Sequence, residues 1–422
     1  MNLHTTPSSL SDLGGQTDYD PDSMPVERAR EFIRRFLQPV REQETVALRD
    51  AYQRTLAQDI VSTINVPPHD NSAMDGYALR AADLASGLTR YTLAGKAYAG
   101  SPYTGSVASG ECVRIMTGAL IPGGCDCVVM QEHADADGAI VTIRGSHSAG
   151  QNIRRAGEDI QQGDTVLRRG QAIGPAEMGL LASLGFGEIP VYRALRVALF
   201  STGDELQQPG TPLGDGRIYD SNRYSLFGLL RELHVDIVDM GSVPDDPATL
   251  KTALLNAAQQ ADAVITSGGV SVGEADHIKR LLAEIGEVVF WKIAMKPGRP
   301  LAYGRIGTCH FFGLPGNPVA VMVTFRQFVG DALRVLMGRQ PAAAFSFPVT
   351  CSSSIRKLPG RTEFQRGILT QDEHGQLQVR TTGEQGSGIL SSMSRANCFL
   401  VLPEEQGNVE AGAEVRVQLF PS

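Results

Sequence analysis

Hydrophobic and polar positions follow different periods in successive parts of the chain. After Ser23 and Pro25, which suit a helix start, apolar residues recur at helical spacing and predict a first helix. Those residues are Val26, Ala29, Ile33, Phe36 and Leu37. Between about residues 60 and 150, short β-prone runs separated by glycine and proline instead predict a small β-rich domain. The runs cover 91–93, 112–115, 127–130 and 139–143.

A repeated strand, loop and helix pattern occupies residues 194 to 338, after a short helix predicted near 175–184. The predicted strands cover 196–200, 235–240, 263–266, 288–293 and 310–313. The predicted helices lie at 220–233, after Asp245-Asp246-Pro247, before about residue 285, and after Pro318. This alternation predicts a Rossmann-like parallel sheet with helices on both faces.

The C-terminal part alternates apolar and polar residues and shows no strong helical period. Five runs read as short strands, which predicts a small β-barrel or sandwich. They cover 347–351, 364–369, 377–380, 399–402 and 415–419.

Composition narrows the class of protein. The 422 residues exceed what one core holds, and 42% hydrophobic with 20% charged residues is an ordinary globular balance. The net charge of −8 argues against a nucleic-acid partner, although a local Lys/Arg pocket still allows an anionic small-molecule ligand. The N-terminus lacks the pattern of a signal peptide and no apolar run is long enough for a membrane span, so we expect a cytoplasmic protein without a membrane partner.

Cysteine spacing gives little support to a metal site. Of the six cysteines only Cys125 and Cys127 are close, and no second pair accompanies them, which disfavours structural zinc. Buried or half-buried thiols in a reducing compartment are the expected state.

Three polar loops follow predicted strands, where ligands of open α/β sheets bind. They are residues 201–205, the glycine-rich loop 267–273, and Leu314-Pro315-Gly316-Asn317-Pro318. Glycines allow close approach to the backbone, and N–H groups at a helix start attract phosphate-like anions. Each loop alone could equally be an ordinary turn, and 267–273 does not match a P-loop.

Charged side chains accompany these loops. Glu205, Asp245 and Asp276 follow three different strands, so they could hold Mg²⁺ together with waters and substrate phosphates. For Asp245 and Asp276, helix capping is the alternative role. Lys292 and Lys296 could neutralise an oxyanion, or could simply protect a solvated sheet edge.

Three further polar strings lie outside the α/β segment: Asp70-Asn71-Ser72-Ala73-Met74-Asp75-Gly76-Tyr77, 114–118 and 152–159. Composition assigns them no task, and an Asx-turn would explain residues 70–72. Together with 200–206, 267–276, 296–300 and 314–318, however, these strings resemble the bacterial MoeA proteins, which are molybdopterin molybdenumtransferases, and the related E domains of gephyrin and its plant counterpart. The resemblance extends from about residue 25 to the end.

The resemblance implies a multidomain α/β plus β fold. Its parts would be a discontinuous linking domain, a β-rich insert domain, a Rossmann-like three-layer α/β domain that binds molybdopterin, and a C-terminal β-barrel. In this sequence they correspond, after a flexible tail at 1–24, to 25–60 with 150–192, then 61–149, 193–340 and 341–422.

The resemblance also implies an activity and a site. Adenylylated molybdopterin and molybdate would give molybdenum cofactor and AMP with a divalent cation, in a homodimer whose site lies between the α/β domain of one subunit and the insert domain of the other. The implied catalytic positions are Asp75, Thr117, Asp159, Glu205, Lys292, Lys296, Arg366 and Ser387, with Asp245, Asp276 and Glu205 as Mg²⁺ ligands. The substrate-binding positions are Ser267, Gly268, Gly269, Ser271, Gly273, Pro297, Gly298, Pro315, Gly316, Asn317 and Pro318.

In this hypothesis, Mg²⁺ bridges the pyrophosphate oxygens of the adenylylated pterin, and molybdate docks near 315–318, Arg366 and Ser387. Positioning and charge neutralisation would suffice without a cysteine or serine nucleophile. The molybdopterin adenylyltransferase is a possible partner. Two other functions remain open: adenylyl transfer to molybdopterin, and a non-catalytic dimeric scaffold.

Overall fold

The computed structural model describes residues 20–268, 275–339 and 345–420, with no description of the side chains of 275–279. Gly269, Ser271, Gly273 and the side chain of Asp276, all expected at the site, therefore lie outside the described residues. The chain divides into two compact units. The larger unit comprises Met1–Glu44, Gln53–Ala57 and Val191–Ser422, and the smaller unit comprises Thr45–Tyr52 and Gln58–Pro190.

The first helix is amphipathic, as its sequence predicts. It is α1 (Val26–Phe36), and its buried residues Val26, Ala29, Phe32, Ile33 and Phe36 form one face. On the other face, the Arg34 guanidinium lies 2.6 Å from the Asp331 carboxylate of α8 (Gly330–Leu336).

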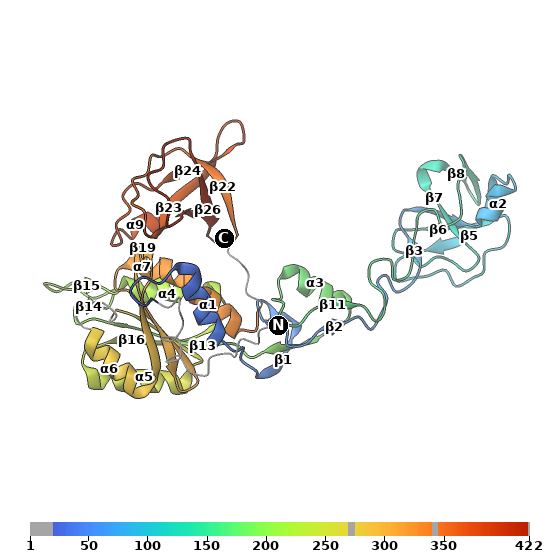
Figure 1. Cartoon of the computed structure of the whole chain (residues 1–422). Coiled ribbons are helices and arrows are strands. Elements are labelled where there is room, and N and C mark those ends of the chain that lie inside the picture. The colour runs from blue at the N-terminus through green and yellow to red at the C-terminus, as the bar shows by residue number, and fades with distance from the viewer. Residues whose placement is uncertain (1–19, 269–274, 340–344, 421–422) are drawn as a thin grey trace, which may run out of the picture. The chain divides into compact units, whose positions relative to one another are not determined.

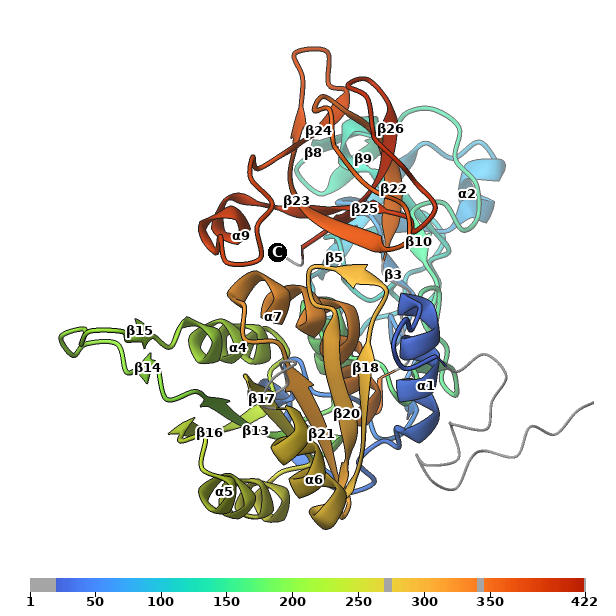
Figure 2. The same cartoon turned by 60° about the vertical axis from the view of Figure 1, so that its left-hand side comes forward.

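A six-stranded sheet forms the centre of the larger unit (Figure 1). Its strand order is β16-β13-β17-β21-β20-β18, and Figure 2 labels all six strands. The strands are β13 (Arg196–Thr202), β16 (Asp236–Val243), β17 (Ala263–Ser267), β18 (Glu287–Lys292), β20 (Pro300–Ile306) and β21 (Cys309–Leu314). Strands β16, β13, β17 and β21 pair in parallel, whereas β20 is antiparallel to both β21 and β18.

The expectation of a wholly parallel sheet is therefore wrong at one strand. Strand β20 was missed because it opens on Pro300, which reads as a break in a strand pattern. A two-residue turn joins it to β21, with Ile306 opposite Cys309 and Gly307 at φ 61°. Such a tight turn makes the two strands antiparallel neighbours.

Helices cover both faces of this sheet, which confirms the three-layer architecture (Figures 1 and 2). Alternate strand residues face opposite ways: Leu199, Ile265 and Phe312 join the core beneath α1, α4, α7 and α8, while Phe200, Val264 and Phe311 join the core beneath α5 and α6. The remaining helices are α4 (Ser221–Glu232), α5 (Pro247–Gln260), α6 (Ala275–Ile285) and α7 (Pro318–Thr324). A π-helical segment, η4 (Phe325–Val329), follows α7 directly and leads into α8. Strands β14 (Leu206–Gln207) and β15 (Ile218–Tyr219) form a small separate sheet.

The C-terminal part is a closed five-stranded barrel, as its alternation predicts. The strand order β23-β24-β22-β26-β25 closes because β25 also pairs with β23. Its strands are β22 (Ser346–Cys351), β23 (Thr362–Gln371), β24 (Leu377–Thr381), β25 (Cys398–Leu402) and β26 (Glu414–Leu419), with a short helix α9 (Ser391–Arg395). Strand β19 (Met295–Lys296) adds to β23 and so joins the barrel to the α/β domain.

The smaller unit contains a six-stranded sheet in the order β7-β4-β6-β5-β9-β8. Its strands are β4 (Gly76–Leu79), β5 (Arg90–Ala97), β6 (Glu111–Ile115), β7 (Cys127–Met130), β8 (Ala134–Asp137) and β9 (Ile140–Ile143). The β-rich character expected between about residues 60 and 150 is therefore confirmed. Strand β4, buried along its whole length, was missed because it directly follows a polar string.

Short elements complete this unit and its borders. The helical ones are η2 (Leu48–Ala51), α2 (Ala81–Ala85), η3 (Gln131–His133) and α3 (Pro175–Ser183). The strands pair as β1 (Gln43–Ala47) with β12 (Glu188–Tyr192), β2 (Ile60–Val61) with β11 (Thr165–Leu167), and β3 (Asn71–Ser72) with β10 (Ile153–Arg154).

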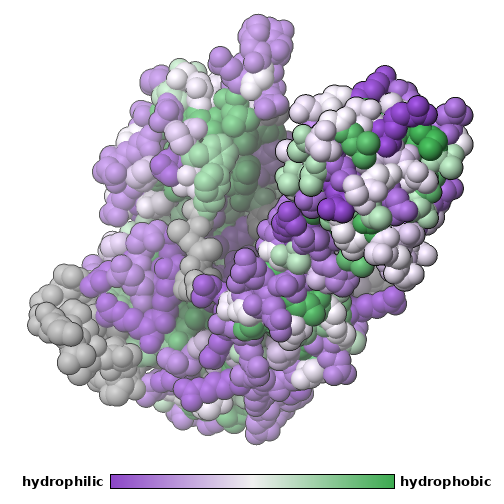
Figure 3. Space-filling view, turned by 90° about the vertical axis from the view of Figure 1, so that its right-hand side faces the viewer, coloured by the Kyte–Doolittle hydropathy of each residue, from purple (hydrophilic) through white to green (hydrophobic). Residues whose placement is uncertain are grey.

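Hydrophilic side chains cover much of the face shown in Figure 3, and hydrophobic ones gather in limited patches. None of the described helices has both the length and the apolar character needed to cross a bilayer. All six cysteines are unpaired; five are buried and Cys125 is half-buried, as expected. Burial raises the pKa of the Cys112 thiol to about 12.

Candidate functional site

The ends of three parallel strands meet at Gly268. Its backbone N–H donates to the carbonyl oxygen of Leu314 over 3.2 Å. Gly268 has φ 96°, and a Cβ atom there would lie 2.4 Å from the carbonyl oxygen of Thr202. Only glycine fits this position, so the glycine at the start of the 267–273 loop serves close backbone packing between β13, β17 and β21.

The amide of Asn222 connects two of the predicted loops. Its Nδ2 donates to the Ser267 hydroxyl over 2.8 Å and to the carbonyl oxygen of Gly316 over 2.7 Å. Ser267, at which the glycine-rich stretch begins, and the 314–318 loop are therefore neighbours, as the rule for parallel sheets predicts. Sequence reasoning missed Asn222, because Asp220-Ser221-Asn222 reads only as a helix start.

Asp245 does not cap the helix that follows it. Asp246 is the N-cap of α5 and accepts from the Thr249 backbone N–H over 2.8 Å. The half-buried Asp245 carboxylate instead accepts a hydrogen bond from the Thr202 hydroxyl at the end of β13. This arrangement leaves Asp245 facing the strand ends, where a ligand of an α/β sheet would lie.

The described carboxylates do not form a complete metal cluster. Glu205 is exposed in the loop after β13. Within residues 20–268, 275–339 and 345–420, no group of three His, Cys, Asp or Glu side chains is arranged to hold a metal ion. The third expected ligand is Asp276, whose side chain is not described.

The two predicted lysines each pair with a carboxylate. Lys292, at the end of β18, places Nζ 2.6 Å from Asp22, and Lys296 in β19 places Nζ 3.5 Å from Glu363 in β23. Both lysines stay about half exposed, at 47% and 49%. The Lys292–Asp22 pair is exposed on both sides and is therefore weak, whereas the carboxylate that pairs with Lys296 is buried. Gly298 and Pro297 beside them are buried.

Arg366 is a buried cation in the barrel strand β23. Its side chain is 1% exposed and donates from Nε to the Ser392 hydroxyl over 3.0 Å and from Nη2 to the carbonyl oxygen of Gly386 over 3.1 Å. None of the ion pairs among the described residues involves Arg366. Burial lowers its pKa to about 10, which still leaves the guanidinium charged at neutral pH. A buried charge without a counter-ion is costly, and an anion would relieve that cost.

The barrel reaches the α/β domain next to this arginine. The carbonyl oxygen of Ser387 accepts from the backbone N–H of Val319, in the first turn of α7, over 3.1 Å. Ser387 directly follows Gly386, which accepts from Arg366. The predicted positions Arg366, Ser387 and Pro318 therefore lie in one region of the larger unit.

In the smaller unit the three polar strings are adjacent. Asp75 accepts from the Thr117 backbone N–H over 2.7 Å and from its hydroxyl over 2.8 Å. These two bonds hold the pKa of the Asp75 carboxyl below its usual value. Asp70 accepts from the Ala156 backbone N–H over 2.8 Å, so the string 152–159 joins the other two. Asp159 is exposed at the end of that string.

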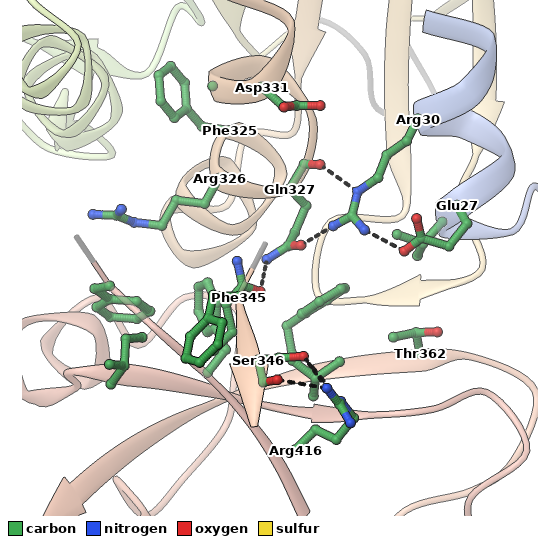
Figure 4. A pocket seen from close by; sticks show the side chains of 18 of the residues that line it. Glu27, Arg30, Phe325, Arg326, Gln327, Asp331, Phe345, Ser346, Thr362 and Arg416 are labelled. Carbon is green, nitrogen blue, oxygen red and sulfur yellow. Dashed lines mark hydrogen bonds and ion pairs between the residues drawn. The ribbon is translucent and has the colours of Figure 1, made fainter. Parts of the chain in front are cut away.

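A separate groove of about 1150 Å³ lies between α1, η4, α8 and the barrel (Figure 4). The Arg30 guanidinium donates from Nε to the carbonyl oxygen of Gln327 over 2.9 Å, and Gln327 Nε2 in turn lies 3.1 Å from Gln418 Oε1 of the barrel. None of the site residues predicted from sequence lines this groove, so it is distinct from the candidate site.

Comparison with known proteins finds similarity over most of the chain. Family models match residues 24–185 as the MoeA N-terminal region (domain I and II), 198–335 as a probable molybdopterin binding domain, and 348–420 as the MoeA C-terminal region (domain IV). A protein of Haemophilus influenzae named molybdopterin molybdenumtransferase is 47% identical over 380 residues, covering 89% of this chain and 94% of the relative. A protein of Dictyostelium discoideum named gephyrin is 35% identical, covering 90% of this chain and 60% of that protein.

A solved structure agrees with the sequence relatives. The crystal structure of a molybdopterin biosynthesis moeA protein from Pyrococcus horikoshii matches with a TM-score of 0.82 at 30% identity, covering 94% of this chain and all of that one (100%). On this similarity in sequence and in fold, the chain belongs to the MoeA family of molybdenum cofactor biosynthesis proteins.

Proposed function

We propose that this chain is a molybdopterin molybdenumtransferase, which inserts molybdate into adenylylated molybdopterin and yields molybdenum cofactor and AMP. The observation that carries the proposal is the buried charge of Arg366, which has no ion-pair partner among the described residues and lies beside Ser387 and the start of α7. A buried guanidinium without a carboxylate suits a permanent oxyanion site, because Arg donors match tetrahedral oxyanions well. The names of the sequence relatives support the same activity.

The two substrates would occupy neighbouring parts of the strand-end region. Molybdate would lie near 315–318, Arg366 and Ser387. The phosphates of the adenylylated pterin would lie near Ser267 and Gly268, with the half-exposed Lys292 and Lys296 offsetting their charge. Pro297, Gly298 and the loop residues Gly269, Ser271 and Gly273 complete the proposed binding set. Among these groups the buried guanidinium of Arg366 is the fixed donor, and such a donor stabilises charge without reorganising during the reaction.

A magnesium ion fits the oxygen donors that are described. Glu205 after β13 and Asp245 after β16 supply hard carboxylate oxygens, and Asp276 would supply a third. Mg²⁺ uses few protein carboxylates and completes its shell with waters and phosphates, so a sparse set suffices. When bound, the ion would neutralise the phosphate charge as the phosphoanhydride is cleaved.

The proposal includes a homodimer with a composite site. Asp75, Thr117 and Asp159 would act on the substrate held by the larger unit of the other subunit. The direct contact between Asp75 and Thr117 supports a shared role for these two residues. The enzyme would work in the cytoplasm, where its unpaired thiols persist, and would receive adenylylated molybdopterin from the molybdopterin adenylyltransferase.

Substitution of one carboxylate tests the assignment. Purified Asp276→Ala protein, incubated anaerobically with adenylylated molybdopterin and limiting molybdate, should release far less AMP than the unchanged protein. Full cofactor synthesis by this variant would overturn the magnesium assignment. Consumption of ATP with free molybdopterin would instead favour adenylyl transfer, and rescue by an inactive double variant of Asp276 and Lys296 would favour a scaffold.

A further inference from the structure

The side chain of Asn222 bonds to two of the loops that follow the parallel strands. It lies in the first turn of α4, and one nitrogen atom, Nδ2, uses both of its hydrogens to reach two different loops. One hydrogen bond, of 2.8 Å, goes to the Ser267 hydroxyl at the end of β17, and the other, of 2.7 Å, goes to the Gly316 carbonyl oxygen after β21. Strands β17 and β21 pair only as far as Ser267 opposite Leu314. The Asn222 amide adds a side-chain link from Ser267 to Gly316, beyond the end of that pairing.

Only one orientation of this amide is compatible with its two hydrogen bonds. The Gly316 carbonyl oxygen can only accept, so a flipped amide would place two oxygens against each other. In the observed orientation Oδ1 is buried and, within the described part of the chain, has no hydrogen-bond partner. A buried acceptor without a partner costs about 1–3 kcal/mol. Fold stability alone therefore does not explain why an asparagine stands at this position.

The helix turn that carries Asn222 is firmly held. Asp220, which is 1% exposed, caps α4 by accepting from the Arg223 backbone N–H over 3.1 Å. The same carboxylate oxygen accepts from the Ser201 hydroxyl of β13 over 3.0 Å. The first turn of α4 is thus fixed to the central strand, and Asn222 extends that attachment to β17 and β21.

The two loops that Asn222 joins correspond to the two halves of the proposed reaction. Ser267 begins the glycine-rich loop that would hold the phosphates. Gly316 precedes α7, whose Val319 N–H bonds Ser387 beside the proposed molybdate site. A small change in the distance between these loops would misalign the two substrates, and misplacement of about 1 Å can cost ~100-fold in rate.

We propose that Asn222 is a positioning residue for metal transfer, which holds the phosphate-binding loop and the molybdate-binding loop at a fixed spacing. This inference rests on the proposed function. Asn222 acts through Ser267 and Gly316 and takes no part in bond making.

The test replaces the amide with side chains of similar size. Asn222→Leu removes both donors and the unpartnered acceptor, so its melting temperature should stay within a few degrees of the unchanged protein. Asn222→Asp keeps the shape and the polarity but removes the donors. Both variants should lower kcat for molybdate-dependent AMP release by about 10–100-fold, with KM for each substrate changed less than about threefold. Asn256→Leu, on an exposed position of α5, is the matched control and should leave kcat unchanged.

A double-variant cycle separates positioning from loss of structure. Because Asn222 and Ser267 act through the same bond, Asn222→Leu combined with Ser267→Ala should lower kcat less than the product of the two single effects. The proposal is overturned if Asn222→Leu and Asn222→Asp both keep kcat within threefold of the unchanged protein. It is also overturned if both lose activity only in step with a large fall in melting temperature. Absence of AMP release by the unchanged protein would instead overturn the proposed function itself.

Discussion

Replacement of Arg366 by methionine separates the functional role of this buried cation from its structural role. The substitution removes hydrogen bonds to Ser392 and Gly386, of 3.0 and 3.1 Å. Each such bond to a charged donor contributes about 1.5–3 kcal/mol. The change also removes a charge that is only 1% exposed and therefore costly to desolvate. Replacing buried ionic side chains by apolar ones typically raises stability by about 1–4 kcal/mol. The two terms oppose each other, and the loss of two bonds slightly outweighs the gain, so the free energy of unfolding should fall by about 2 kcal/mol.

The activity of the Arg366→Met variant should change far more. Loss of one preorganised donor to an oxyanion typically lowers kcat by about 10²–10³-fold, or about 3–4 kcal/mol. Arg366→Lys keeps the charge without the planar fork and should be intermediate, near 10-fold. The assay is AMP release as a function of molybdate concentration, with urea unfolding of each variant as the control. An Arg366→Met protein that stays folded and releases AMP within threefold of the unchanged rate would refute the role of Arg366 as an oxyanion donor.

Three further predictions follow from particular contacts. Mixing Arg366→Met with Asp75→Asn should restore about one quarter of the unchanged activity, because half of the dimers would be mixed and each would hold one intact site; no recovery on mixing would contradict a composite site. Gly268→Ala should lower the free energy of unfolding by about 2–4 kcal/mol through its contact with Thr202, whereas Gly307→Ala, with no atom near its Cβ, should cost only about 1 kcal/mol; equal losses in urea unfolding would refute the close-packing argument. His310 is 6% exposed and burial lowers its pKa to about 4, below the ordinary 6.5, so stability is complete above pH 6.5 and is lost as the pH falls toward 4. Between pH 7 and 5 this loss should be about 2 kcal/mol and should be absent in His310→Gln; an unchanged pH slope in that variant would contradict it.

The period of hydrophobic residues predicted most helices and strands, because burial of one face of a helix or strand imposes a regular spacing on apolar residues. Helix α1, the five barrel strands and the parallel strands β13, β16, β17 and β21 lie where their patterns place them. Strands β4 and β20 were missed since their first residues, after a polar string and at Pro300, resemble loop sequence. Nothing local to 300–306 reveals that the strand runs against its neighbours.

The site was foreseeable only in part, because its geometry depends on contacts between distant residues. The rule that ligands lie at strand ends correctly grouped Ser267 with Gly316. The sequence did not show which of the adjacent Asp245 and Asp246 caps α5, and in the structure the cap is Asp246. The contacts of Arg366 and of the bridging Asn222 amide join residues 20 to 94 positions apart, and no local pattern signals them.

The central claim is that this chain transfers molybdenum into adenylylated molybdopterin. The most direct measurement is anaerobic incubation of the purified protein with adenylylated molybdopterin, magnesium and molybdate, with AMP and molybdenum cofactor quantified together. We expect release of AMP that depends on molybdate and matches the cofactor formed one for one. Cofactor formation without AMP release, or no molybdate-dependent AMP at all, would contradict it.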